Sequence, residues 1–84
     1  MKFYVYIIGC KTKSKFTTYV GYTINLKKRI ILHNKGKGAK FTRGRKWKLI
    51  YSEILKNKSE ALSREYFIKK NRKFRNKIKK NYKN

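Results

Sequence analysis

Three short stretches of the chain are rich in β-branched and aromatic side chains and carry the apolar–polar alternation, or the continuous apolar character, of β-strands. They predict strands at residues 2–8, 16–21 and 47–54. The polar segment 10–15 predicts a hairpin loop, so the first two strands are expected to pair antiparallel. Such pairing would bring Tyr6 and Tyr19 into the same neighbourhood.

Alternation also assigns side chains to the two faces of the predicted sheet. In the first strand we expect Phe3, Val5 and Ile7 on one face and Tyr4, Tyr6 and Ile8 on the other. In the third strand we expect Trp47, Leu49 and Tyr51 opposite Lys48, Ile50 and Ser52. Because the first strand is apolar on both faces, it is expected to be buried.

The first helix is expected to begin after Asn25, a favourable N-cap residue, and to end at about Asn34. Its apolar stripe consists of Leu26, Ile30 and Ile31.

One basic residue of this helix differs from its neighbours. Arg29 lies three residues after Leu26 and so borders the apolar stripe, whereas Lys27 and Lys28 are expected to be solvated. His33 shares a side of the helix with Arg29 because the two are four residues apart.

The segment 34–46 contains three glycines, six basic residues and one aromatic residue, and it cannot bury a face. It is therefore predicted to be a loop whose amides and cations suit phosphate contacts. The candidate nucleic-acid-binding residues are Lys35, Lys37, Lys40, Arg43, Arg45 and Lys46. A merely solvated basic loop has the same composition.

The second helix is expected to begin after Asn57, which Glu60 follows in a capping pattern, and to end at about Lys70. Its inward side chains are expected to be Ala61, Leu62, Tyr66, Phe67 and Ile68. A Lys- and Arg-rich helix is predicted at residues 72–84, with Phe74, Ile78 and Tyr82 spaced by four. It either packs on the domain or lies along nucleic acid.

The order β-β-α-β-α-α predicts an α+β fold with a central three-stranded antiparallel sheet flanked by helices. The 84 residues are expected to form a single domain, 1–84, with a small core to which aromatic residues contribute much of the apolar area. Twenty-six Lys and Arg residues face three acidic ones, a net charge of +23, which indicates a polyanionic partner such as nucleic acid. An AT-rich genome would explain the lysines but not the scarcity of acids.

Cys10 is the only cysteine, which excludes an intrachain disulfide and a cysteine metal cluster. The sequence has no signal-peptide pattern and no apolar run of transmembrane length. We therefore expect no membrane partner and a cytoplasmic location, near the nucleoid in a prokaryote.

The three acidic residues limit the possible enzyme chemistry. Glu60 fits a helix start and Glu53 an ordinary surface charge at a strand end. Glu65 lies on the apolar stripe, three residues from both Leu62 and Ile68, where a carboxylate must be paired, hydrogen-bonded or metal-bound. From spacing alone, an ion pair with a lysine or arginine is the simpler explanation.

Widely separated carboxylates argue against a two-metal nuclease and against a paired-carboxylate glycosidase. One glutamate, two strand tyrosines, an arginine and a histidine could instead support one-metal phosphodiester cleavage. A nearby Mg2+ and a positive field would both favour a tyrosine phenolate, and Arg29 could hold a phosphate oxygen. Each tyrosine taken alone is explained more simply as a core or sheet residue.

In order and spacing, these residues resemble the GIY-YIG nuclease domain family, and specifically its small stand-alone subgroup. Tyr4-Val5-Tyr6 stands where the family has Gly-Ile-Tyr, and Tyr19-Val20-Gly21 stands where it has Tyr-Ile-Gly. The resemblance covers roughly residues 3–80.

Further matches follow along the chain. Arg29 matches the family's helix arginine, and His33-Asn34 matches a frequent His-Asn at the end of that helix. Residues 36–44 resemble the loop typical of the subgroup, and Glu65 falls on the family's metal-binding glutamate.

This resemblance implies one divalent ion, Mg2+ or Mn2+, held by Glu65, with Arg29 stabilising the phosphate. It also implies that Tyr6 is the general base or water activator, that Tyr19 positions water or phosphate, and that His33 assists the base. The family usually attaches this domain to a separate targeting module. Specificity is therefore expected from the basic loop, the C-terminal helix or a partner protein.

The first hypothesis is a metal-dependent endonuclease that hydrolyses phosphodiester bonds in DNA, with structure-selective or weak specificity. The second is a non-catalytic module that binds DNA or RNA, and the third is a small RNA-binding or ribosome-associated protein. Charge supports all three. The set Tyr6, Tyr19, Arg29, His33 and Glu65 favours the enzyme, and with it DNA over RNA.

Overall fold

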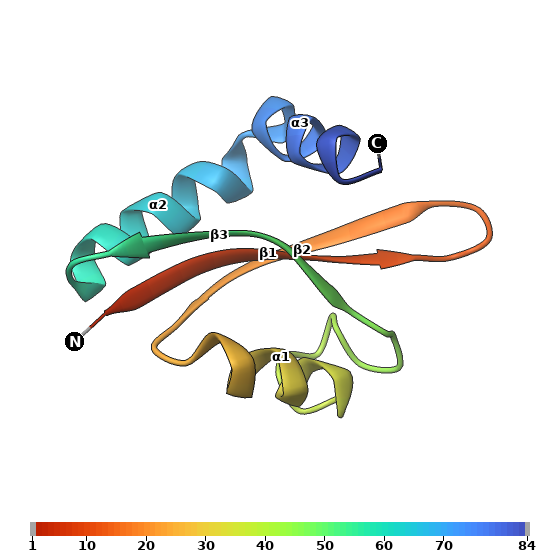
Figure 1. The fold of residues 1–84 in the computed structure, drawn as a ribbon, viewed down its shortest axis with the longest axis horizontal. Coiled ribbons are helices and arrows are strands. Elements are labelled where there is room, and N and C mark those ends of the chain that lie inside the picture. The colour runs from red at the N-terminus through yellow and green to blue at the C-terminus, as the bar shows by residue number, and fades with distance from the viewer. Residues whose placement is uncertain (1, 84) are drawn as a thin grey trace.

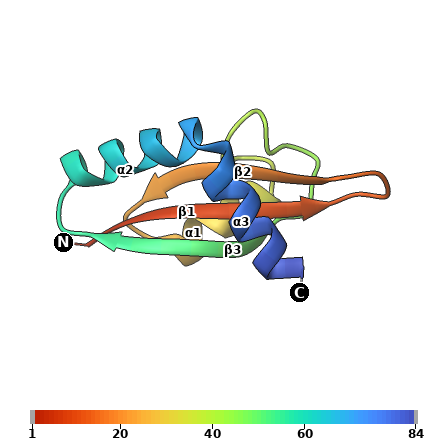
Figure 2. The same ribbon diagram turned by 90° about the horizontal axis from the view of Figure 1, so that it is seen from above.

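A computed structural model describes residues 2–83, which form a three-stranded antiparallel sheet between helices (Figure 1). The elements are β1 (Phe3–Lys11), β2 (Phe16–Thr23), α1 (Leu26–Asn34), β3 (Lys48–Leu55), α2 (Lys58–Lys70) and α3 (Arg72–Lys83). The strand order β2-β1-β3 places β1 in the centre. Helix α1 covers one face of the sheet, and α2 and α3 cover the other, where α3 crosses over β1 and β3 (Figure 2). The predicted fold class is confirmed.

Strands β1 and β2 are longer than predicted, so the expected loop at 10–15 is wrong at its start. Cys10 is buried and pairs with Thr17, and the turn closes with a 2.9 Å hydrogen bond from the Thr12 N–H to the Lys15 carbonyl. Gly9 does not end the strand. A Cβ there would lie 2.6 Å from the Phe16 ring, so this glycine makes room for packing.

A β-bulge in β3 changes the predicted faces of that strand. Ile7 pairs with Tyr51, but Ile8 pairs with Leu49, which leaves Ile50 as the extra residue. As a result Ile50 and Tyr51 both pack on the side of α2 and α3, although alternation predicted opposite faces. Simple alternation fails because two residues of β3 oppose one of β1.

Two apolar clusters fill the space on either side of the sheet. The cluster under α2 and α3 consists of Val5, Ile7, Val20, Ala61 and Ile68. The cluster under α1 consists of Tyr6, Ile8, Cys10 and Trp47. The predicted separation of the β1 side chains into two faces is confirmed.

Asn25 and Asn57 cap α1 and α2 as predicted, and each side chain accepts a hydrogen bond from the backbone N–H three residues later. The predicted apolar stripes are too wide. Ile31 of α1 is exposed, and only Ala61 and Ile68 of α2 are buried. The expected inward residues Leu62, Tyr66 and Phe67 are exposed as well. Each helix contacts the sheet along a narrow stripe, so only one or two side chains in every two turns are buried.

Helix α3 packs on the sheet, which is the first of the two arrangements expected for it, packing on the domain or lying along nucleic acid. Phe74 and Ile78 contact the cluster under α2 and α3, and the Tyr82 ring meets the Phe16 ring edge-on with centroids 5.9 Å apart. Among residues 2–83, no helix has the length and apolar character needed to cross a membrane.

Candidate active site

The candidate site forms where β1, β2 and α1 meet, around the hydroxyl of Tyr6. This side chain is fully buried, and its Oη lies 2.7 Å from Nε2 of His33 on α1. Gly21 of the edge strand β2 pairs directly with Tyr6. A Cβ at Gly21 would lie 2.5 Å from the Tyr6 Oη, so the glycine leaves the space that the hydroxyl occupies.

His33 is the second fully buried polar group of the site. The Tyr19 ring of β2 packs edge-on against the imidazole, with centroids 5.2 Å apart, and also stacks on Phe41. On its far side, the His33 Nδ1 lies 2.9 Å from Oγ1 of Thr42, which is itself fully buried. The predicted nearness of Tyr6 and Tyr19 therefore occurs in the structure, and both rings meet the imidazole of His33.

Arg29 lies one turn before His33 on α1 and faces the same group of side chains. Its Nε is buried and has no hydrogen-bond partner among the described residues. Arg29 as a whole is half-buried and its guanidinium bonds the Tyr6 hydroxyl, but this Nε–H is a donor without an acceptor, as is the Nε–H of Arg75 on α3. A phosphate oxygen beside Tyr6 would satisfy it.

Burial and Arg29 together set the protonation of the site. Burial raises the pKa of the Tyr6 hydroxyl above its usual value, although the Arg29 guanidinium beside it acts in the opposite direction. Burial, and then the positive charge of Arg29, lower the pKa of His33. At neutral pH the pair is therefore a neutral phenol hydrogen-bonded to a neutral imidazole.

Glu65 reaches the site from α2. Its charge acts on Tyr6 and raises the pKa of that hydroxyl further. The Glu65 side chain is only 16% exposed, and its carboxylate lies 3.6 Å from the Nζ of Lys69 one turn later. The ion pair that spacing alone favoured is thus present. It is made with a half-exposed lysine and contributes about 1 kcal/mol at most.

The donor set suits a lightly coordinated hard cation. Within residues 2–83, no three His, Cys, Asp or Glu side chains gather to hold a metal by protein ligands alone. Mg2+ binds through one or two carboxylates, keeps several waters and takes further oxygens from substrate phosphates. A single carboxylate, Glu65, whose charge is felt at Tyr6, fits that mode of binding.

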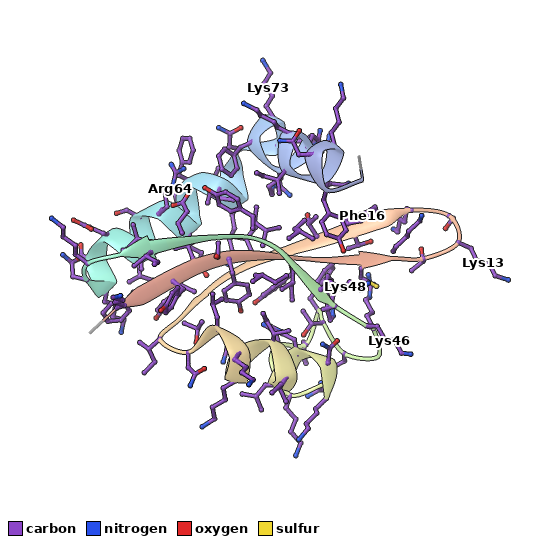
Figure 3. The ribbon with its side chains drawn as sticks, in the orientation of Figure 1. Lys13, Phe16, Lys46, Lys48, Arg64 and Lys73 are labelled. Atoms are coloured by element: carbon purple, nitrogen blue, oxygen red, sulfur yellow. The ribbon has the colours of Figure 1, made fainter. Side chains whose placement is uncertain are left out.

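The loop between α1 and β3 presents its cations to solvent but also buries part of itself. Lys35, Lys37, Lys40, Arg43 and Lys46 are exposed, whereas Arg45 is half-buried. Lys46 points outward from the molecule (Figure 3).

The expectation that this loop buries no face is wrong at Thr42. The Thr42 carbonyl accepts a hydrogen bond from the Trp47 indole N–H at 2.9 Å, and the Asn34 side chain bonds both backbone groups of Trp47. These hydrogen bonds hold the loop in place, since the loop has few apolar side chains that could do so by packing.

Sequence reasoning missed Thr42 as a partner of His33. The nearby Gly38 is the one local hint, because a Cβ at Gly38 would collide with the His33 ring. That collision is visible only in the folded chain, so the sequence alone could not reveal the pair.

Sequence reasoning also misjudged Glu53. This residue is not an ordinary surface charge, because Arg64 of α2 holds it with three hydrogen bonds of 2.7–3.0 Å and the Tyr51 hydroxyl donates to it (Figure 3). This cluster joins α2 to β3 on the face of the sheet opposite to Tyr6.

Comparison with known proteins agrees with this geometry. The sequence matches the GIY-YIG catalytic domain over residues 2–81. The chain belongs to the GIY-YIG family. GIY-YIG proteins are in general endonucleases that use divalent metal ions.

Several GIY-YIG relatives are small proteins of similar size. The chain is 59% identical to a UPF0213 protein of Clostridium perfringens over 68 residues, covering 80% of this chain and 70% of that protein. It is 52% identical to a UPF0213 protein of Staphylococcus haemolyticus over 69 residues, covering 81% of this chain and 80% of that protein. A solution structure of a UPF0213 protein from Bacillus halodurans shares the fold, with a TM-score of 0.54, 39% identity, and coverage of 93% of this chain and 82% of that one.

Proposed function

We propose that this protein is a metal-dependent endonuclease that hydrolyses phosphodiester bonds in DNA. The observation that carries the proposal is the buried Tyr6–His33 hydrogen bond of 2.7 Å beside an arginine whose Nε has no partner among residues 2–83. Any buried tyrosine hydroxyl needs a hydrogen-bond partner, but a purely structural tyrosine has no need of an adjacent arginine with a buried, unsatisfied N–H.

In this proposal each residue takes the role that the family resemblance implies. Arg29 binds a non-bridging phosphate oxygen and stabilises the negative charge that grows on it. Tyr6 accepts a proton from the attacking water with the help of His33, and Tyr19 orients the water or phosphate. Glu65 would hold one divalent ion, Mg2+ or Mn2+, which supplies Lewis-acid polarisation of the phosphate when bound. The exposed loop cations would hold the DNA backbone.

The test is cleavage of labelled single-stranded, duplex, flap and branched DNA in Mg2+ or EDTA by the wild type and by Glu65→Gln. We expect Mg2+-dependent cuts that Glu65→Gln slows by at least about 100-fold, because losing a group that merely supports a metal ligand already costs about 10–100-fold. DNA affinity should stay the same or increase.

Glu60→Gln is the matched control, since it makes the same charge change on the same helix at an exposed position. It should cleave like the wild type. Wild-type rates for Glu65→Gln would contradict the metal role of Glu65. Binding without cleavage by the wild type on every substrate would indicate a nucleic-acid-binding module instead.

A further inference from the structure

Thr42 connects His33 to the backbone of the loop between α1 and β3. Its Oγ1 lies 2.9 Å from Nδ1 of His33 and 3.0 Å from the carbonyl oxygen of Ala39. Both His33 and Thr42 are fully buried, so water does not compete for these contacts. The three groups form one chain of hydrogen bonds that continues through Nε2 of His33 to the Tyr6 hydroxyl.

The Ala39 carbonyl at one end fixes the donor and acceptor of every hydrogen bond in this series. A carbonyl oxygen can only accept, so the single hydroxyl hydrogen of Thr42 must point to Ala39. The Thr42 oxygen is then an acceptor toward His33, and the Nδ1 must carry the ring hydrogen. A neutral imidazole has only one N–H, so its Nε2 holds a lone pair and accepts from Tyr6. The opposite arrangement would place oxygen lone pairs of Thr42 and Ala39 against each other at 3.0 Å.

We propose that Thr42 is a positioning residue that fixes His33 in the Nδ1–H tautomer, so that Nε2 is the proton acceptor for Tyr6. The catalytic consequence rests on the proposed function, whereas the ring state is a property of the protein alone. Gly38 supports the arrangement because its missing Cβ lets the loop backbone close over the imidazole. Trp47 fixes Thr42 from the other side through its indole N–H.

This tautomer lets Tyr6 act as a base without becoming a free phenolate. As the attacking water breaks an O–H bond, its proton goes to Tyr6 Oη, and the Tyr6 proton moves to Nε2 of His33. The water oxygen keeps the electron pair for attack on phosphorus, and the imidazole ends with both nitrogens protonated. Because burial raises the pKa of Tyr6, this route avoids a buried phenolate. The positive charge forms instead on His33, whose pKa burial and Arg29 lower, so the anionic phosphate must help to stabilise it. The Nε2–H tautomer would give Tyr6 a donor and no place for its proton.

Nitrogen-15 NMR of the imidazole tests the ring state directly. His33 is the only histidine of the chain, so both ring nitrogens are assigned without ambiguity. In wild-type protein free of metal and DNA we expect a protonated Nδ1 and an unprotonated Nε2. Thr42→Val, which removes the hydroxyl at similar size, should populate the Nε2–H tautomer, and Thr42→Ser should behave like the wild type. An Nε2–H ring in the wild type, or an unchanged ring in Thr42→Val, would overturn the inference.

Single-turnover DNA cleavage tests the consequence. Thr42→Val should cut about 10–100-fold more slowly with unchanged DNA affinity, the usual cost of losing a histidine's orienting partner, and Thr42→Ser should restore the rate. Thr18→Val, at a partly exposed site on the opposite face of β2 from Tyr19, is the control. Wild-type rates for Thr42→Val would overturn the positioning role. If the wild type cleaves no DNA, the proposed function fails, and the NMR result still decides the ring state.

Discussion

At the residue scale, two missing side chains shape the candidate site as much as those that are present. Tyr6 Oη lies where a Cβ of Gly21 would be, and the His33 ring lies where a Cβ of Gly38 would be. Neither glycine has a positive φ, unlike Gly36 at +78°. Close approach of a neighbouring ring, and not backbone freedom, therefore explains why these two positions are glycine.

Gly21→Ala should disturb the Tyr6–His33 contact. The new methyl would lie 2.5 Å from Oη and 2.7 Å from Cζ of a ring that has no free space to move into. We expect a loss of about 1–3 kcal/mol in unfolding free energy, typical of overpacking, together with a large fall in DNA cleavage. Thermal denaturation and single-turnover cleavage measure the two effects.

Gly9→Ala is the control for this substitution. Its methyl would overlap the Phe16 ring at 2.6 Å, on the face of the sheet that α2 and α3 cover. It should cost similar stability but leave cleavage nearly intact, because Tyr6 and the α1 residue His33 lie on the other face of the sheet. Equal loss of cleavage in both variants would show that activity follows stability alone.

At the scale of elements, a polar cluster fixes α2 to the sheet, while α2 itself buries little apolar surface. Glu53 of β3 is 17% exposed and accepts hydrogen bonds from Arg64 of α2 and from Tyr51. Arg64 also lies over the Phe67 and Phe74 rings, at 4.9 and 5.4 Å from their centroids. Since α2 carries Glu65, this cluster helps to place the candidate metal ligand.

The Glu53 cluster predicts a pH dependence of stability. Hydrogen bonds from Arg64, and in addition from Tyr51, lower the pKa of Glu53 below its ordinary 4.5 despite its burial. A lowered pKa in the folded state gives stability that is complete above pH 4.5 and is lost as the pH falls through the folded value. Glu53→Gln should therefore cost about 1–2 kcal/mol at pH 7, and the difference from the wild type should shrink on acidification. Urea denaturation from pH 7 to 3 measures this, with exposed Glu60→Gln as control, and a pH-independent difference would contradict it.

The same elements show what the sequence alone could predict. Asn25 and Asn57 marked both helix starts because capping is local. The hairpin that brings Tyr6 and Tyr19 into one neighbourhood follows from two adjacent strands. The bulge at Ile50 was not predictable, because it depends on how β3 meets β1. The Glu53–Arg64 and His33–Thr42 pairs were missed for the same reason. Which polar side chains become partners depends on their distances in the folded chain, and these distances cannot be read from spacing along the sequence.

At the scale of the whole molecule, 26 Lys and Arg residues against three acidic ones give the chain a strong positive charge. The net charge of +23 ensures binding to any nucleic acid at low salt, so affinity alone does not locate the DNA. Two surfaces compete for that role. The loop cations flank Thr42 and therefore adjoin His33, whereas Lys73 of α3 points away from the sheet (Figure 3). We therefore expect that DNA bound near Tyr6 contacts the loop.

Salt dependence of duplex binding, measured in EDTA to prevent cleavage, distinguishes the two surfaces. Each lost phosphate contact reduces the slope of log K against log salt concentration by about 1. Lys40 and Arg43 are exposed on the loop, and Lys73 and Lys77 are exposed on α3, so neutralising either pair with glutamine changes the net charge equally. We expect the Lys40→Gln, Arg43→Gln variant to reduce the slope by about 2 and the Lys73→Gln, Lys77→Gln variant to change it little. A larger change from the α3 pair would place the DNA along that helix, far from the residues that we propose cleave it.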